Sequence, residues 1–172
     1  QYLDMSFEKR NKISEEEYID MVKKKTAMLI AASCSTPAVL FGKDKKVVDV
    51  LWNFGLLSGT AFQIHDDVLD VIGGEKIGKD WCSDIVEGKK TLVIIKAMES
   101  GINLKIFGKG NAGNEEKKKA VEKLIECGAI DYAKLKAKSY LNEAKSCLSF
   151  LNESPARNLL EEIADYLILR EY

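Results

Sequence analysis

The residues best suited to chemistry form an acidic stretch at positions 62–70, which reads Phe-Gln-Ile-His-Asp-Asp-Val-Leu-Asp. In a helix, Asp66 and Asp70 share one face because they are four residues apart, and Asp67 lies beside them. Buried carboxylates that lie close together repel one another, and each needs a partner. A divalent cation such as Mg²⁺ suits such oxygen ligands and binds phosphate oxygens as well. The stretch therefore predicts a metal-bridged phosphate site; the alternative is a solvated acidic stripe.

Lysines lie on both sides of the acidic stretch in the sequence. Lys79 and Lys89 follow it, each directly after a glycine, and Lys25 precedes it. Lysine ammonium groups bind phosphate oxygens as point charges, and glycines let the backbone approach a ligand closely. The three lysines are candidates for a diphosphate site, although Lys25 also fits a solvated charged face. We interpret the lysine run 117–119 as solvated surface.

A series of helices is predicted to position these residues. Ser14 and Glu17 form a capping box, in which each side chain accepts a hydrogen bond from a backbone N–H at the start of a helix. This helix is expected to run to about residue 35 and to be ended by Pro37. Its expected inward-facing positions are Ile19, Val22, Met28, Leu29 and Ala32.

The acidic stretch itself lies on the most apolar helix of the sequence. Asp44 is a suitable N-cap for this helix, and the glycine pair 73–74 is a suitable end. Because the helix is hydrophobic nearly all round, it is predicted to be buried. Gly55 and Gly59 lie inside it, although each costs about 1 kcal/mol relative to alanine. They indicate the close approach of either a neighbouring helix or a ligand chain.

The rest of the sequence also favours helices. A loop with a short helical piece is expected at 75–90, and the stretch 108–114 is the most linker-like. Further helices are expected at about 91–99, 115–127 and 129–151, and from Pro155 onward with Ser154 as the cap. Strand-like alternation is absent from the sequence, so the predicted class is all-α, a helical bundle.

Composition limits the possible classes of protein. The chain has 172 residues, of which 46% are hydrophobic, and a net charge of −1. This predicts one folded domain over 1–172 and argues against disorder and nucleic-acid binding. The sequence contains no run of about 18 apolar residues, so we expect no transmembrane segment. Four widely spaced cysteines and one histidine predict free thiols in a cytoplasmic protein.

Taken in series, these motifs closely resemble the trans-isoprenyl diphosphate synthases, which include the farnesyl and geranylgeranyl diphosphate synthases. The acidic stretch, followed by Lys79, Asp84 and Lys89, is similar to the second aspartate-rich region of that family. The phrases Gln1-x-x-Asp4 and Lys25-Thr26 also match family motifs in the right order. The resemblance covers nearly the whole chain.

The resemblance implies an isoprenoid-synthase-type bundle of antiparallel helices, usually a homodimer, around a central cavity. It also implies a Mg²⁺-dependent prenyl transfer. An allylic diphosphate ionises, the double bond of isopentenyl diphosphate attacks the allylic cation, and loss of a proton leaves a longer all-trans prenyl diphosphate. Positive charges that face the departing diphosphate stabilise it, and an apolar cavity excludes water that would quench the cation.

The resemblance also implies a role for each motif residue. The metal ligands would be Asp66, as the chief ligand, with Asp67 and Asp70 ligating directly or through water. The residues that hold the allylic diphosphate would be Lys25, Lys79 and Lys89. The oxygen dipoles that face the allylic cation would belong to Thr26 and Gln63. Supporting positions near the cavity would be Gln1 and Asp4.

The chain departs from the family pattern in two ways. Cys82 stands where the family typically has glycine. The family's first aspartate-rich motif has no counterpart here, so the sequence resembles the C-terminal half of a synthase without its N-terminal helices. We therefore expect the 172 residues alone to be inactive. The product chain length cannot be predicted, because in the family it depends largely on residues near the first motif.

Two other functions remain open at the level of the sequence. The first is a non-catalytic regulatory subunit that pairs with a true synthase, and the second is a terpene cyclase of the same fold. A regulatory subunit has no physical need for a buried acidic cluster, and Gln63 and the lysine motifs fit the synthases better than the cyclases. Prenyl transfer is therefore the favoured interpretation.

Overall fold

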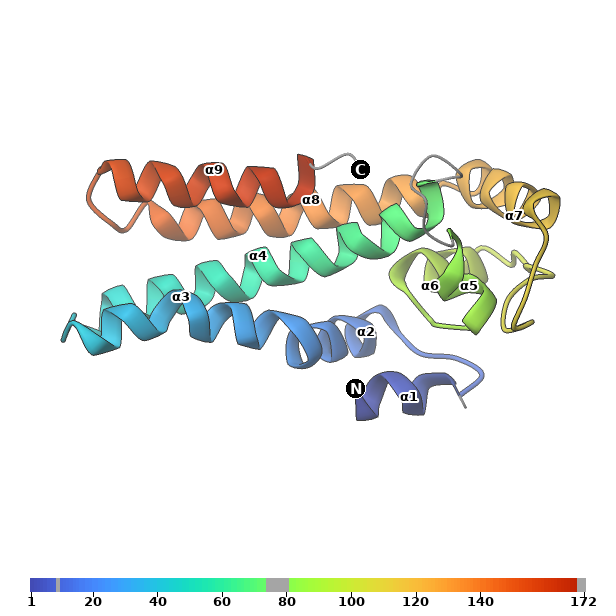
Figure 1. Cartoon of the computed structure of the whole chain (residues 1–172), viewed down its shortest axis with the longest axis horizontal. Coiled ribbons are helices and arrows are strands. Elements are labelled where there is room, and N and C mark those ends of the chain that lie inside the picture. The colour runs from blue at the N-terminus through green and yellow to red at the C-terminus, as the bar shows by residue number, and fades with distance from the viewer. Residues whose placement is uncertain (9, 74–80, 170–172) are drawn as a thin grey trace. The chain divides into compact units, whose positions relative to one another are not determined.

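The computed structural model describes residues 1–8, 10–73 and 81–169. Within these residues the chain is helical and has no β-strand, which confirms the all-α class. Figure 1 shows the helices, which in chain order are α1 (Tyr2–Glu8), α2 (Glu15–Val22), η1 (Lys23–Ala27), α3 (Met28–Leu40), α4 (Lys45–Ile72), α5 (Ser83–Glu87), α6 (Leu92–Glu99), α7 (Asn114–Glu126), α8 (Ala129–Leu148) and α9 (Pro155–Leu169).

The helices form two compact units, which are described separately. Unit 1 consists of Gln1–Met21 and Ile64–Leu135, and unit 2 of Val22–Gln63 and Lys136–Glu171. The continuous helix α4 contributes residues to both units. That the whole chain forms a single domain stays a prediction.

Side-chain caps begin three helices where the sequence predicts them. The N–H of Ser14 donates to Glu17 Oε2 at 2.9 Å, and the N–H of Glu17 donates to Ser14 Oγ at 3.2 Å, which completes the capping box before α2. Asp44 accepts from a backbone N–H in the first turn of α4, and Ser154 does the same for α9. These caps satisfy N–H groups that have no partner within the helix.

The helix predicted from residue 15 to about 35 differs from the prediction. It contains the π-helical segment η1, and α3 then continues through Pro37 to Leu40. The prediction that Pro37 ends the helix is wrong. Proline removes one backbone hydrogen bond, but the helix turns once more and the N–H of Phe41 donates to the carbonyl of Pro37 at 3.0 Å. Burial of Ala38, which is 4% exposed, stabilises this last turn.

The π-helical turn changes which side chains face the interior of the molecule. A π turn closes an i→i+5 hydrogen bond, so the positions after it are rotated relative to an uninterrupted α-helix. Ile19 and Val22, which precede the turn, are buried as predicted. Met28 and Leu29, which follow it, are 46% and 73% exposed, so their predicted inward orientation is wrong. The buried positions are small residues instead: Ala27, Ala31, Ser35 and Ala38.

Within unit 2, Gly55 and Gly59 of α4 lie against this row of small residues. A Cβ atom added at Gly55 would lie 2.7 Å from the Cα atom of Ala31, and one at Gly59 would lie 2.8 Å from the Cα atom of Ala27. Contacts this short do not occur, so the two helices approach so closely only because both positions lack a side chain. Helix packing, rather than a ligand chain, therefore accounts for both glycines.

The C-terminal helices also belong to unit 2. Figure 1 shows α9 running antiparallel beside the second part of α8. Lys145 Nζ lies 2.9 and 2.7 Å from the two carboxylate oxygens of Asp165, which joins the two helices at their edge. Their buried faces form one cluster with α4, made of Phe54, Ala61, Leu141, Ala144, Leu148 and Ala164. The small residues in this cluster allow close helix packing.

Unit 1 contains α6, most of whose side chains are buried. Lys90, two residues before α6, is also buried, with 8% exposure. Its Nζ donates to the carbonyl of Phe7 at 2.9 Å and lies 5.5 Å from the centroid of the Phe107 ring. Lys90 thus attaches the C-terminal part of α1 to the start of α6.

The lysine run 117–119 is only partly solvated. Lys117 is 6% exposed, and its Nζ lies 6.0 Å from the centroid of the Trp81 ring. The interpretation of the run as solvated surface is therefore wrong for Lys117. It shares the buried face of α7 with Ala120 and Leu124, three and seven residues later.

Two predictions about membranes and cysteines can be compared with the structure. Among the described helices, α4 is long and apolar enough to cross a membrane by length and composition alone, and 44% of its most apolar window is buried within the protein. A core helix of a soluble protein meets the same criteria, so this is weak evidence for a membrane span. The four cysteines are free thiols, as predicted.

Candidate active site

The three aspartates of the acidic stretch lie near the C-terminal end of α4, in unit 1. Asp67 is buried, with 7% exposure, and Asp66 and Asp70 are half-buried. Ile64 and Val68, which belong to the same part of the helix, are completely buried. This part of α4 is therefore not a solvated acidic stripe.

Asp67 is bound by a tyrosine from another helix. The hydroxyl of Tyr18 on α2 donates to Asp67 Oδ2 at 2.6 Å, and Tyr18 is only 1% exposed. Burial raises the pKa of Tyr18 well above its usual value, and the negative charge of Asp67 raises it further. The charges of Asp84 and Asp4 act in the same direction, so both carboxylates lie within electrostatic reach of this hydroxyl. The hydroxyl consequently stays protonated and remains a hydrogen-bond donor.

Asp70 connects α4 to α5. Its Oδ1 accepts hydrogen bonds from the hydroxyl and the N–H of Ser83 at 2.6 and 3.1 Å, and its Oδ2 accepts from the N–H of Asp84 at 3.2 Å. Both backbone donors belong to the first turn of α5, where N–H groups have no partner within the helix. Burial raises the pKa of Asp70, although the Ser83 hydroxyl opposes the rise, and the charge of Asp84 adds to it.

The residue just before α5 has an unusual backbone conformation. Cys82 has φ 58° and ψ 24°, which lies in the left-handed region that favours glycine. Its N–H donates to the carbonyl of Asp70 at 2.7 Å, and its side chain is completely buried. Burial, followed by the charge of Asp70, raises the pKa of the thiol to about 12. The conformation favours glycine, which is the residue that the resemblance implies at this position.

Lys89 follows α5 and is paired with two carboxylates. Its Nζ lies 2.6 Å from Asp84 Oδ1 and 2.8 Å from Glu87 Oε2. Partial burial lowers the pKa of Lys89, but the hydrogen bonds to Asp84 and Glu87 outweigh this effect and the net pKa is raised. The ammonium group therefore stays charged. A phosphate that bound Lys89 would share it with these carboxylates or displace them.

Two of the predicted site residues meet in unit 2. Thr26 Oγ1 donates to Gln63 Oε1 at 2.8 Å, so the structure brings together the pair predicted to face the allylic cation. Thr26 and the exposed Lys25 lie on η1. Single π-helical turns within α-helices occur frequently at functional sites. This local irregularity therefore coincides with the Lys25-Thr26 motif.

The other predicted residues are placed as follows. Lys79 lies outside the described residues. On α1 in unit 1, Asp4 is half-buried, and Gln1 is exposed just before the helix begins. Lys25, Thr26 and Gln63 belong to unit 2, whereas the three aspartates belong to unit 1.

The acidic residues can be tested for their fit to a divalent cation. Among the described residues, no three His, Cys, Asp or Glu side chains form a ready metal site. Oxygen atoms of Asp67 and Asp70 are directed to Tyr18 and to α5 instead. Mg²⁺, however, commonly takes only one or two carboxylates and completes its shell with waters and phosphate oxygens. A site that used only one or two of these carboxylates would be of this kind.

Sequence reasoning missed the role of Tyr18. Tyr18 and Asp67 are 49 positions apart, and no spacing rule relates them. The available signal is that Tyr18 directly precedes Ile19 on the inward-facing side of α2. Asp84 is part of the family motif, but its pairing with Lys89 could not be read from the sequence.

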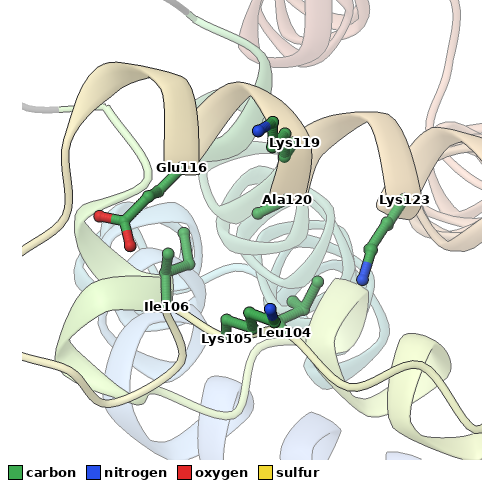
Figure 2. A pocket seen from close by; sticks show the side chains of 7 residues that line it. All are labelled: Leu104, Lys105, Ile106, Glu116, Lys119, Ala120 and Lys123. Atoms are coloured by element: carbon green, nitrogen blue, oxygen red, sulfur yellow. The ribbon is translucent and has the colours of Figure 1, made fainter.

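Unit 1 also has a surface pocket of about 180 Å³, which lies apart from the predicted site residues. Figure 2 shows it between α7 and the segment 104–106. Its lining combines apolar side chains with lysines: Leu104, Ile106, Ala120, Lys105, Lys119 and Lys123, together with Glu116. Because no predicted site residue lines it, we do not include this pocket in the candidate active site.

Comparisons with known proteins identify the family of the chain. Residues 1–125 match the model of the polyprenyl synthetase family, and the chain belongs to this family. It is 57% identical over its whole length to a geranylgeranyl pyrophosphate synthase of Geoglobus acetivorans and 41% identical to a geranylfarnesyl diphosphate synthase of Natronomonas pharaonis. A polyprenyl synthase from Caulobacter crescentus, solved with calcium and isoprenyl diphosphate, is 31% identical, with a TM-score of 0.87 over 98% of this chain.

The chain spans about half the length of these relatives. It covers 54% of the Geoglobus protein, 51% of the Natronomonas protein and 54% of the Caulobacter structure. The matched half contains the acidic stretch and the lysine motifs described above.

Proposed function

We propose that these residues form part of the active site of an enzyme that condenses an allylic diphosphate with isopentenyl diphosphate into a longer all-trans prenyl diphosphate. The observation that carries this proposal is the buried acidic cluster of α4, with Asp67 bound by Tyr18 and Asp70 bound to α5. The names of the two relatives, a geranylgeranyl and a geranylfarnesyl diphosphate synthase, support the same reaction class.

In this proposal the aspartates bind a divalent cation, Mg²⁺ in the cell. Asp66 is the chief ligand and Asp67 assists it. Asp70 has roughly four acceptor positions, and donors from Ser83 and Asp84 on α5 occupy three of them. In this proposal it binds the cation directly or through water with the remaining position. The bound cation would neutralise charge on the diphosphate as it leaves. The Caulobacter structure, which contains calcium and isoprenyl diphosphate, supports a divalent cation with this class of ligand.

The remaining residues act on the organic substrates. Lys25, Lys79 and Lys89 bind the allylic diphosphate, and their charges stabilise the negative charge that develops as it departs. The Thr26 hydroxyl donates to the Gln63 amide oxygen, which orients that amide. The oxygen dipoles of both side chains then face the allylic cation. We also propose that the protein is a cytoplasmic homodimer, and the free cysteines support a reducing compartment.

The test joins residues 1–172 to the N-terminal part of the Geoglobus acetivorans enzyme, which is 57% identical over the region replaced. We call this protein the fused synthase. It is expected to form prenyl diphosphate from a labelled allylic diphosphate and isopentenyl diphosphate in the presence of Mg²⁺. The 172-residue chain alone is expected to form none. The substitution Asp66→Asn in the fused synthase is expected to lower kcat at least about 100-fold, because it removes charge from the cation site.

The matched control is Asp165→Asn, which removes a carboxylate that pairs with Lys145 at the edge of unit 2. This control is expected to keep full activity, because the pair lies outside the predicted site residues and a partly exposed ion pair contributes only modestly to stability. An inactive fused synthase that is correctly folded would contradict the proposal. If that inactive protein stimulated a separate active synthase, the regulatory-subunit hypothesis would replace it.

A further inference from the structure

The hydrogen bond between Tyr18 and Asp67 joins two buried groups. The two atoms are 2.6 Å apart, and the side chains are 1% and 7% exposed. A buried carboxylate has few waters to solvate it, so it needs donors from the protein. The tyrosine supplies a donor from α2 to a residue on α4, and both residues belong to unit 1.

The chemical nature of this donor matters for cation binding. A lysine or arginine partner would orient the carboxylate but also cancel its charge. The tyrosine hydroxyl is neutral, so it fixes one oxygen of Asp67 without itself cancelling the charge of the carboxylate. Asp84 shows the contrasting arrangement, because it is paired with the ammonium group of Lys89 at 2.6 Å.

We propose that Tyr18 is a positioning residue of the cation site, because its hydroxyl holds the Asp67 carboxylate in one orientation for a divalent cation bound with diphosphate. This inference rests on the proposed function, in which Asp67 assists Asp66 in binding the cation. Tyr18 acts through Asp67 and touches neither the cation nor the substrate. Hydrogen-bond partners of metal ligands typically change metal affinity or activity by about 10- to 100-fold when they are removed.

The test is Tyr18→Phe in the fused synthase, which removes the hydroxyl and keeps the ring. Mn²⁺ binding is measured by calorimetric titration in the presence of inorganic diphosphate, and the Mg²⁺ concentration that gives half-maximal rate is measured separately. Tyr18→Phe is expected to raise the dissociation constant for Mn²⁺ and the half-maximal Mg²⁺ concentration by about tenfold each. The matched control is Tyr132→Phe, which removes a Tyr–carboxylate hydrogen bond of 2.7 Å to Glu15 elsewhere in unit 1 and is expected to change neither.

A double-mutant cycle shows whether Tyr18 acts through Asp67. In an Asp67→Asn background, Tyr18→Phe is expected to cause no further loss of Mn²⁺ affinity. A full additional tenfold loss in that background would contradict the inference. If Tyr18→Phe does not fold, Asp67→Glu is used instead, because it keeps the charge but displaces the carboxylate. It is then expected to weaken Mn²⁺ binding, and an unchanged affinity would contradict the inference.

The outcomes separate this inference from the proposed function. A folded Tyr18→Phe protein with the parent's Mn²⁺ affinity and Mg²⁺ requirement overturns the positioning role, even if its melting temperature has fallen. An unmutated fused synthase that binds Mn²⁺ with diphosphate but makes no prenyl product overturns the proposed function only.

Discussion

Asp70 and Cys82 act together on the turn that begins α5. Asp70 binds the first N–H groups of α5 through its side chain, and its carbonyl accepts the N–H of Cys82. This geometry requires the left-handed conformation of Cys82, which costs a residue with a Cβ atom about 1–2 kcal/mol. The turn therefore keeps Asp84 and Lys89 near the acidic cluster at the expense of local strain.

The strain at Cys82 can be measured by comparing two substitutions. Cys82→Gly and Cys82→Ala both remove the buried sulfur, but only alanine keeps the Cβ atom that disfavours the left-handed region. The glycine variant is expected to be the more stable of the two, by about 1 kcal/mol in the free energy of unfolding from urea denaturation. Equal stabilities, or a more stable alanine variant, would show that the backbone at this position is not strained.

At the scale of single residues, local chemistry was predictable and distant contacts were not. The sequence predicted the acidic cluster and proposed a shared role for Thr26 and Gln63, and the structure joins these two side chains by a hydrogen bond. It could not predict that Tyr18 binds Asp67, because hydrogen bonds between distant helices depend on tertiary packing. Burial of Lys117 was missed for the same reason.

At the scale of helices, the beginnings were predictable because caps use neighbouring residues. Ser14, Asp44 and Ser154 each cap the expected helix. The π-helical turn η1 and the continuation through Pro37 were not predictable. The turn and the continuation both place small residues of α3 against α4. Tertiary packing therefore determines these two features, and local propensity does not.

The close contact between α3 and α4 makes a prediction for Gly55→Ala. A Cβ atom there would meet backbone atoms of Ile30 and Ala31 at 3.0 Å or less. Overpacking costs about 1–3 kcal/mol, and rigid backbone neighbours place this site toward the upper end. This exceeds the gain of about 1 kcal/mol in helix propensity. Thermal melting is therefore expected to show a lower melting temperature for the variant.

The control for this substitution is Asn53→Ala, two residues earlier on the same helix at an exposed position. It gains the helix propensity of alanine without meeting another backbone and is expected to be neutral or slightly stabilising. If Gly55→Ala were as stable as Asn53→Ala, the two helices would not be in backbone contact.

At the scale of the whole molecule, unit 2 carries an exposed apolar stripe on α9. Leu159, Ile163 and Tyr166, spaced by four and three residues, are 55%, 46% and 70% exposed. Leu160, next to the first of them, packs against the core cluster instead. Apolar stripes of this kind favour association between molecules in solution.

The isolated 172-residue chain is therefore expected to self-associate, and the double variant Leu159→Lys with Tyr166→Lys is expected to reduce this without lowering the melting temperature. Light scattering after size-exclusion chromatography at increasing concentration measures the effect. Leu160→Lys serves as the control and is expected to lower the melting temperature, because it replaces an apolar side chain that packs against the core cluster with a charged one. A lower melting temperature for the double variant would mean that the stripe is packed within the molecule.

Unit 1 is built from two separate pieces of the chain, Gln1–Met21 and Ile64–Leu135. The bond from Lys90 to Phe7 spans 83 residues, and the bond from Tyr18 to Asp67 spans 49. A ribosome adds about 5–20 residues per second, so roughly 4–17 seconds separate the synthesis of Phe7 from that of Lys90. During that interval the carbonyl of Phe7 lacks its Lys90 donor, and for roughly 2–10 seconds after its own synthesis Tyr18 lacks Asp67. These hydrogen bonds of unit 1 thus form well after α1 and α2 are made, and a chaperone that binds the nascent chain would protect both helices until their partners emerge.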